Sequence, residues 1–177
     1  MNGYEFYPED GSTLYEEEAW ELSEQARSLW LRLTFAGEYS EGMSPVQIQG
    51  RKYLPMFPAR DGVYTIEQVR EKFLVVFSEE FTDKTLNAAI ASKDLLEYNG
   101  NVYAAYRKNR GEASYNSWAD HVRDDGDGKF TVVMGVSMPP DGSTVYVELP
   151  TEKNAAGKFV FTDYPYWDCL LYTSDAA

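Results

Sequence analysis

The chain has 177 residues, and hydrophobic residues make up 44% of it, which is enough to build the core of a single domain. With 29 acidic and 16 basic residues, its formal net charge is −13. This charge repels nucleic acid and anionic lipid, and no run approaches the ~20 apolar residues of a membrane span, so we expect neither a nucleic-acid-binding protein nor a membrane-spanning one. The acidity favours solubility or attraction to a basic partner.

Both ends of the chain differ from its middle. Residues 1–13 are polar and aromatic and form a lead-in segment, and no apolar stretch typical of a signal peptide follows Met1. The last nine residues read CLLYTSDAA, which resembles a translated sequencing adapter, so residues 168–177 are predicted to be a non-native tail. Cys169 is the only cysteine, which excludes an internal disulfide. Residues 14–167 are predicted to form one domain.

The first predicted helix begins near residue 13. Thr13 and Glu16 fit a capping box, and Gly37 supplies a stop. The residues between them that recur at helical spacing are Ala19, Leu22, Ala26, Leu29, Trp30 and Leu33. An irregular stretch with short extended pieces follows, in which Pro55 and Pro58 argue against a central strand.

A pair of helices is predicted next. Thr65 and Gln68 fit a second capping box, and an apolar stripe follows: Ile66, Val69, Phe73, Val76 and Phe77. Ser78 and the acidic pair after it interrupt this stripe. A short helix carrying Leu86, Ala89 and Ile90 is predicted to start near Thr82 or Asp83.

The remainder of the domain predicts strands. Asn99-Gly100 joins 95–98 to 101–106 and fits a type I′ hairpin turn. Residues 115–123 fit a strand or a helix equally well, whereas 129–138 and 145–149 alternate cleanly, with Asp124–Gly128 as a turn between strands. A polar loop at 150–157 and a last strand at 159–164 complete the domain. Helices followed by strands predict an α+β fold, with an N-terminal helix and a helical pair packed on a twisted antiparallel β-meander.

Catalytic and metal-binding patterns are not visible. His121 is the only histidine, and Ser114, Ser117 and Asp120 near it in sequence do not make a catalytic triad, which requires proximity in space. The acidic turn fails the EF-hand spacing, because alignment on Gly128 puts arginine at the first ligand position and methionine at the last. We therefore expect no enzyme, no metal and no cofactor. A pair among the strand carboxylates, Glu97, Asp120, Glu148 and Asp163, stays open as a catalytic alternative.

The surplus of aromatic residues is the clearest indication of binding. The sequence has 14 Tyr, 9 Phe and 4 Trp, and tyrosine suits interfaces because it is amphipathic. The alternative is that these rings form the core and rim of the sheet. The candidate binding residues combine the aromatics around the hairpin with the acidic turn: Tyr103, Tyr106, Tyr115, Trp118, Asp124, Asp125 and Asp127.

Three segments carry a family resemblance. In this order, TIEQVREKFLVVFSEEF, LLEYNGNVYAAYR and GKFVFTDYPYW resemble the IseA family of extracytoplasmic bacterial proteins, which inhibit cell-wall D,L-endopeptidases. The resemblance extends over roughly Tyr15 to Trp167. It implies an exported, non-catalytic monomer that binds an NlpC-type cysteine-peptidase domain and blocks its active-site cleft. The leader that export requires is expected to be absent from this chain.

Two other interpretations remain. An NTF2-like domain would bind or convert a small ligand in a cavity, with His121 and a strand carboxylate facing that cavity together. A structural domain of a surface lipoprotein would need neither a cavity nor a binding face.

Overall fold

The computed structural model describes residues 11–34, 44–106, 116–138 and 142–165. Within these ranges the chain forms three α-helices and two antiparallel sheets of four strands each, which confirms the α+β class. Residues 1–10 of the predicted lead-in segment (1–13), Tyr115 and the predicted tail at 168–177 lie outside the described residues.

Helix α1 (Glu16–Thr34) buries the face that the sequence predicts, including Ala19, Leu22 and Ala26. It begins later than a capping box at Thr13 would place it, because the first helical hydrogen bond runs from the Ala19 N–H to the Tyr15 carbonyl. The predicted start was therefore wrong. The acidic first turn still lies where the helix dipole favours negative charge.

Helix α2 (Ile66–Leu74) starts with the predicted capping box. The Thr65 side chain accepts from the Gln68 N–H, and the Gln68 side chain accepts from the Thr65 N–H. Helix α3 (Glu79–Ala91) begins earlier than predicted, because Ser78 caps it by accepting from the Phe81 N–H. The residues taken as an interruption of the stripe are thus the start of the next helix.

Sheet A contains four short strands in the order β1-β2-β4-β3: β1 (Val46–Ile48), β2 (Arg51–Pro55), β4 (Asn101–Ala105) and β3 (Leu95–Tyr98). The predicted hairpin is confirmed, with positive φ at both Asn99 and Gly100. The expectation that Pro55 excludes a central strand was wrong: β2 lies between β1 and β4, and Pro55 is its last residue, opposite Tyr103.

Sheet B is the meander β5-β6-β7-β8: β5 (Asn116–Gly126), β6 (Lys129–Met138), β7 (Ser143–Lys153) and β8 (Phe159–Phe161). The ambiguous segment is therefore a strand, which the β5–β6 pairing fixes. Strand β7 runs through Pro150 into the predicted polar loop. Its missing N–H costs no bond to β6, since the Pro150 carbonyl points the other way and accepts from the Thr162 N–H.

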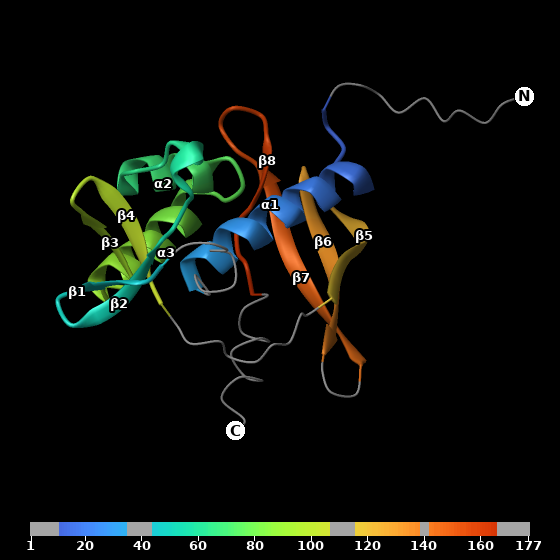
Figure 1. The fold of residues 1–177 in the computed structure, drawn as a ribbon. Helices are drawn as coiled ribbons and strands as arrows, with labels where there is room; N and C mark the ends of the chain where they lie inside the picture. The colour runs from blue at the N-terminus through green and yellow to red at the C-terminus, as the bar shows by residue number, and fades with distance from the viewer. Residues whose placement is uncertain (1–10, 35–43, 107–115, 139–141, 166–177) are drawn as a thin grey trace, which may run out of the picture.

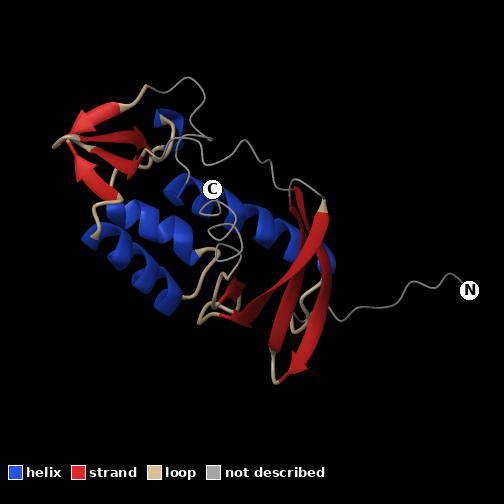
Figure 2. Ribbon diagram, turned by 90° about the horizontal axis from the view of Figure 1, so that it is seen from below, coloured by secondary structure: helices blue, strands red, loops and turns tan. Residues whose placement is uncertain are grey.

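The two sheets lie on either side of the helices (Figures 1 and 2), so the hairpin β3–β4 does not continue the meander. Helix α1 contacts β4 of sheet A and β5 of sheet B. One buried cluster takes residues from all three helices and both sheets. At its centre Phe77 contacts Phe81, Phe161 and Tyr164, with ring centroids 4.9, 6.4 and 5.5 Å away.

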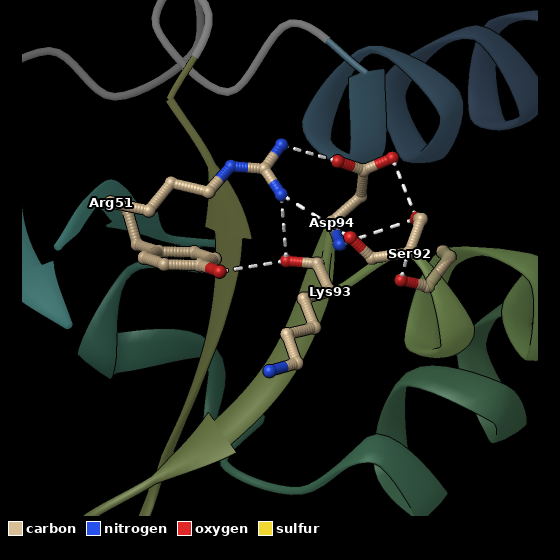
Figure 3. A network of polar contacts seen from close by, with 6 residues as sticks. Arg51, Ser92, Lys93 and Asp94 are labelled. Atoms are coloured by element: carbon tan, nitrogen blue, oxygen red, sulfur yellow. Dashed lines mark hydrogen bonds and ion pairs between the residues drawn. The ribbon is translucent and has the colours of Figure 1, made fainter. Parts of the chain in front are cut away.

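A polar network holds sheet A against the end of α3 (Figure 3). The Arg51 guanidinium donates to the Asp94 carboxylate at 2.5 Å and to the carbonyls of Ser92 and Lys93, and the Tyr53 hydroxyl donates to the Lys93 carbonyl. Carbonyls at the end of a helix have no partner within it, so these donors satisfy acceptors that the end of α3 leaves open. The network accounts for Arg51 and Asp94 as structural residues.

Candidate functional site

The outer face of sheet B is the side turned away from the helices. Val132, Met134 and Val136 of β6 and Val147 and Leu149 of β7 belong to the core, so the residues that alternate with them point outward. Residues directly opposite on neighbouring strands share a side. The outer face therefore carries Trp118, His121, Arg123, Thr131, Val133, Gly135, Tyr146 and Glu148.

Trp118 lies over Gly135 on the neighbouring strand. A Cβ built on Gly135 would lie 2.4 Å from two carbons of the indole, so only glycine leaves room for the ring at this place. The same glycine faces Tyr146 of β7, whose exposed fraction is 59%. The indole thus covers β6 at the residue that separates Trp118 from the exposed tyrosine.

Asp120 lies in a bulge of β5 and links two side chains of the outer face. Its carboxylate is 2.7 Å from Nδ1 of His121 and accepts from Nε1 of Trp118 at 3.4 Å. The hydrogen bond from His121 lowers the pKa of Asp120, and the bond from Trp118 lowers it further. The bulge thereby fixes the polar edge of the indole with a carboxylate that stays ionised.

A second polar cluster surrounds Arg123. Its guanidinium donates to Asp125 at 2.8 Å and to Glu148 at 2.6 Å, which joins β5 to β7 over Thr131. The Thr131 hydroxyl donates to Asp125; this bond and then the guanidinium lower the pKa of that carboxyl. The single positive charge is thus already shared by two carboxylates, and the cluster keeps a negative balance.

The other two acids of the turn point elsewhere. Asp124 lines a groove of about 660 Å³ on the helix side of sheet B, with Glu16 and Glu17 of α1 among its neighbours. Asp127 sits at the tip of the turn with a positive φ of 54°, followed by Gly128 with 75°, which is the geometry of a two-residue hairpin loop. The hairpin is therefore confirmed, but its turn is shorter than the predicted Asp124–Gly128, because Asp124 to Gly126 belong to β5. The acids of this segment do not converge on one point.

The structure separates the candidate aromatics. Tyr103 belongs to the side of sheet A away from the main core, packed against the small cluster of Ile48, Tyr53 and Ala105, whereas Tyr106 packs against the main core. Trp118 alone lies on the outer face of sheet B. Of the predicted residues, the outer face brings together only Trp118 and Asp125, and nothing is described for Tyr115.

The strand carboxylates do not form a catalytic pair in the described chain. Glu97 of sheet A accepts from the Ile66 N–H at the start of α2, while Glu148 pairs with Arg123.

The side chain of His121 is 52% exposed and lines none of the three grooves found beside α1 and α3 in the described residues. It therefore faces solvent rather than a cavity.

Sequence reasoning missed Tyr146 and Gly135. Tyr146 interrupts the inward residues Val145, Val147 and Leu149, so alternation alone places it outside. Gly135 stands inside a strand, where glycine often marks a close approach of another group. Both signals were present in the sequence, but only the strand register shows that they belong to one site with Trp118.

Comparison with known proteins identifies no family for the chain: no protein-family model matches it, and no curated protein matches its sequence. Among the described residues, no group of three or more histidine, cysteine or acidic side chains is placed to hold a metal ion, and none of the helices is long and apolar enough to cross a bilayer.

Proposed function

We propose that this chain is a non-catalytic extracytoplasmic protein that inhibits NlpC-type cell-wall D,L-endopeptidases by binding over their active site. The observation that carries the proposal is the outer face of sheet B. There, the half-buried ring of Trp118 and the exposed ring of Tyr146 are combined with ion pairs whose charged groups already satisfy one another. The resemblance to the IseA family supplies the class of target.

The small-ligand alternative has less support. It requires His121 and a strand carboxylate to face one cavity, but His121 and its partner Asp120 lie on an open face. The largest described groove is lined by the acids Glu16, Glu17 and Asp124 together with apolar and aromatic residues such as Leu14 and Phe130, and neither His121 nor Asp120 is among its lining residues.

The proposal is tested by an inhibition assay. The Cys169→Ser chain is added at rising concentration to an NlpC-type D,L-endopeptidase domain that digests purified peptidoglycan, and released peptide ends are followed. Saturable inhibition is expected, and the inhibiting chain is expected to stay intact during the digestion. An unchanged rate with several such peptidases would contradict the proposal.

A charge-reversal experiment tests the acidic end of the outer face. Asp125→Lys combined with Asp127→Lys is expected to slow association with a basic peptidase domain and to reduce its dependence on salt, because charges at a rim act mainly on the association rate. The matched control is Glu24→Lys with Glu71→Lys, two exposed helical carboxylates away from this face. Equal association rates for both pairs at low salt would remove the acidic turn from the interface.

A further inference from the structure

We propose that Trp118 and Tyr146 form the hot spot of a protein interface, which fits a partner surface with an apolar pocket bordered by lysine or arginine side chains. This inference rests on the proposed function and names the contact through which it operates. Neither Tyr146 nor Gly135 belongs to the sequence motifs that carry the family resemblance.

The first argument is that the indole is held in place before any partner binds. Gly135 provides the space under the ring, and the Asp120 carboxylate accepts from its Nε1 while also bound to His121. A side chain that is already ordered loses little rotamer freedom on association. A large aromatic side chain that is ordered before binding is the kind of residue that contributes most of the binding energy at an interface.

The second argument is the position of Tyr146. Trp118, Gly135 and Tyr146 stand opposite one another on β5, β6 and β7, so the two aromatic Cα atoms are about 10 Å apart, two strand spacings. The indole fills part of the space between them, because it covers the glycine in the middle. The two rings therefore lie on the same face with only Gly135 of β6 between them, where one apolar pocket of a partner can contact both.

The third argument is charge, and it selects the partner. Beside the two rings, β5 and β7 carry the carboxylates Asp120, Asp125, Glu148 and Glu152. Arg123 lies within 4 Å of both Asp125 and Glu148, and Lys129 lies within 4 Å of Glu152. The lowered pKa values of Asp120 and Asp125 keep these two groups ionised in acidic surroundings as well. A negative rim around aromatic residues complements a basic rim around an apolar pocket.

The experiment measures binding of the Cys169→Ser chain, and of variants in that background, to a D,L-endopeptidase domain. Trp118→Ala and Tyr146→Ala are each expected to weaken binding about 30-fold or more, the effect of a hot-spot truncation. Tyr98→Ala, which removes a 46% exposed aromatic from sheet A, is the matched control and is expected to leave affinity within about twofold. Thermal unfolding of each variant checks that the fold is retained.

Gly135→Ala separates the position of the indole from its presence. The added Cβ displaces the ring, so affinity is expected to fall although both aromatics remain. In a chain that already carries Trp118→Ala, the same change is expected to have no further effect on affinity, because there is no indole left to displace. An equal loss in both backgrounds would show that Gly135 acts through the fold and not through Trp118.

The outcomes distinguish this inference from the function on which it rests. Wild-type inhibition with unchanged affinity in Trp118→Ala and Tyr146→Ala would overturn the hot spot and leave the proposed function standing. Absence of wild-type binding to every peptidase tested would overturn both. Binding of an N-acetylglucosamine tetramer that is lost in Trp118→Ala, with no peptidase bound, would replace the protein partner by a glycan.

Discussion

At the scale of single residues, the ion pairs of this protein divide into those that hold the fold and those that shape its outer face. Arg70 of α2 contacts Asp83 of α3 at 2.7 Å and Glu79 at 3.3 Å, and thereby joins the two helices. The hydrogen bond from Arg70 lowers the pKa of Asp83. Arg123 makes an equivalent pair of contacts on sheet B, but there the contacts order an exposed surface.

The pair between Arg70 and Asp83 predicts a pH-dependent stability. Because the folded-state pKa of Asp83 is below its ordinary value, the stabilisation is present above the unfolded-state pKa and disappears as the pH falls through the folded-state pKa. Asp83→Asn is therefore expected to unfold at lower denaturant concentration than the wild type near neutral pH. The difference should shrink toward zero in strongly acidic buffer, and in high salt.

Denaturant unfolding across this pH range, with the exposed turn residue Asp127→Asn as the control, provides the measurement. A wild-type advantage that stays constant down to the most acidic buffer would show that the substitution acts through packing and not through the ion pair.

At the scale of secondary-structure elements, the sequence predicted the structure well where the structure depends on residues close together in the chain. The capping box formed by Thr65 and Gln68 and the turn at Asn99-Gly100 each involve neighbours in the chain, and both were confirmed. Ser78 was misjudged because the apolar stripe continues to Phe77, although its hydroxyl is a strong helix cap. The Thr13 box was wrong because Glu16, which the box requires at the third helical position, is the first residue of the helix.

The capping box of α2 predicts a measurable contribution to stability. Thr65→Ala removes the acceptor for the Gln68 N–H and is expected to lower the free energy of unfolding by about 1 kcal/mol. Thr85→Ala, inside α3, is the matched control: it is expected to be neutral or slightly stabilising, because alanine is the better helix former. Equal values of the free energy of unfolding for the two variants in urea would contradict a role for the cap.

At the scale of the whole molecule, the main feature that the sequence did not predict is the division of the strands into two sheets. Between Tyr106 and Asn116 the chain passes from sheet A to sheet B, which separates aromatics that are close in sequence. Strand partners such as β2 with β4 lie far apart in the chain, and alternation does not specify them. The α+β class needs only the order of elements, whereas the candidate site needs these long-range pairings.

The central claim, that the chain covers the active site of a cysteine peptidase, is tested most directly by protection of the catalytic thiol. Because Cys169 is the only cysteine, the Cys169→Ser chain carries no thiol, and a small alkylating reagent then reports only on the peptidase. We predict that a saturating amount of the chain slows alkylation of the catalytic cysteine in proportion to inhibition, and that Trp118→Ala does so far less. Inhibition without any protection of that thiol would contradict occlusion of the active site, and the absence of both would contradict the proposed function itself.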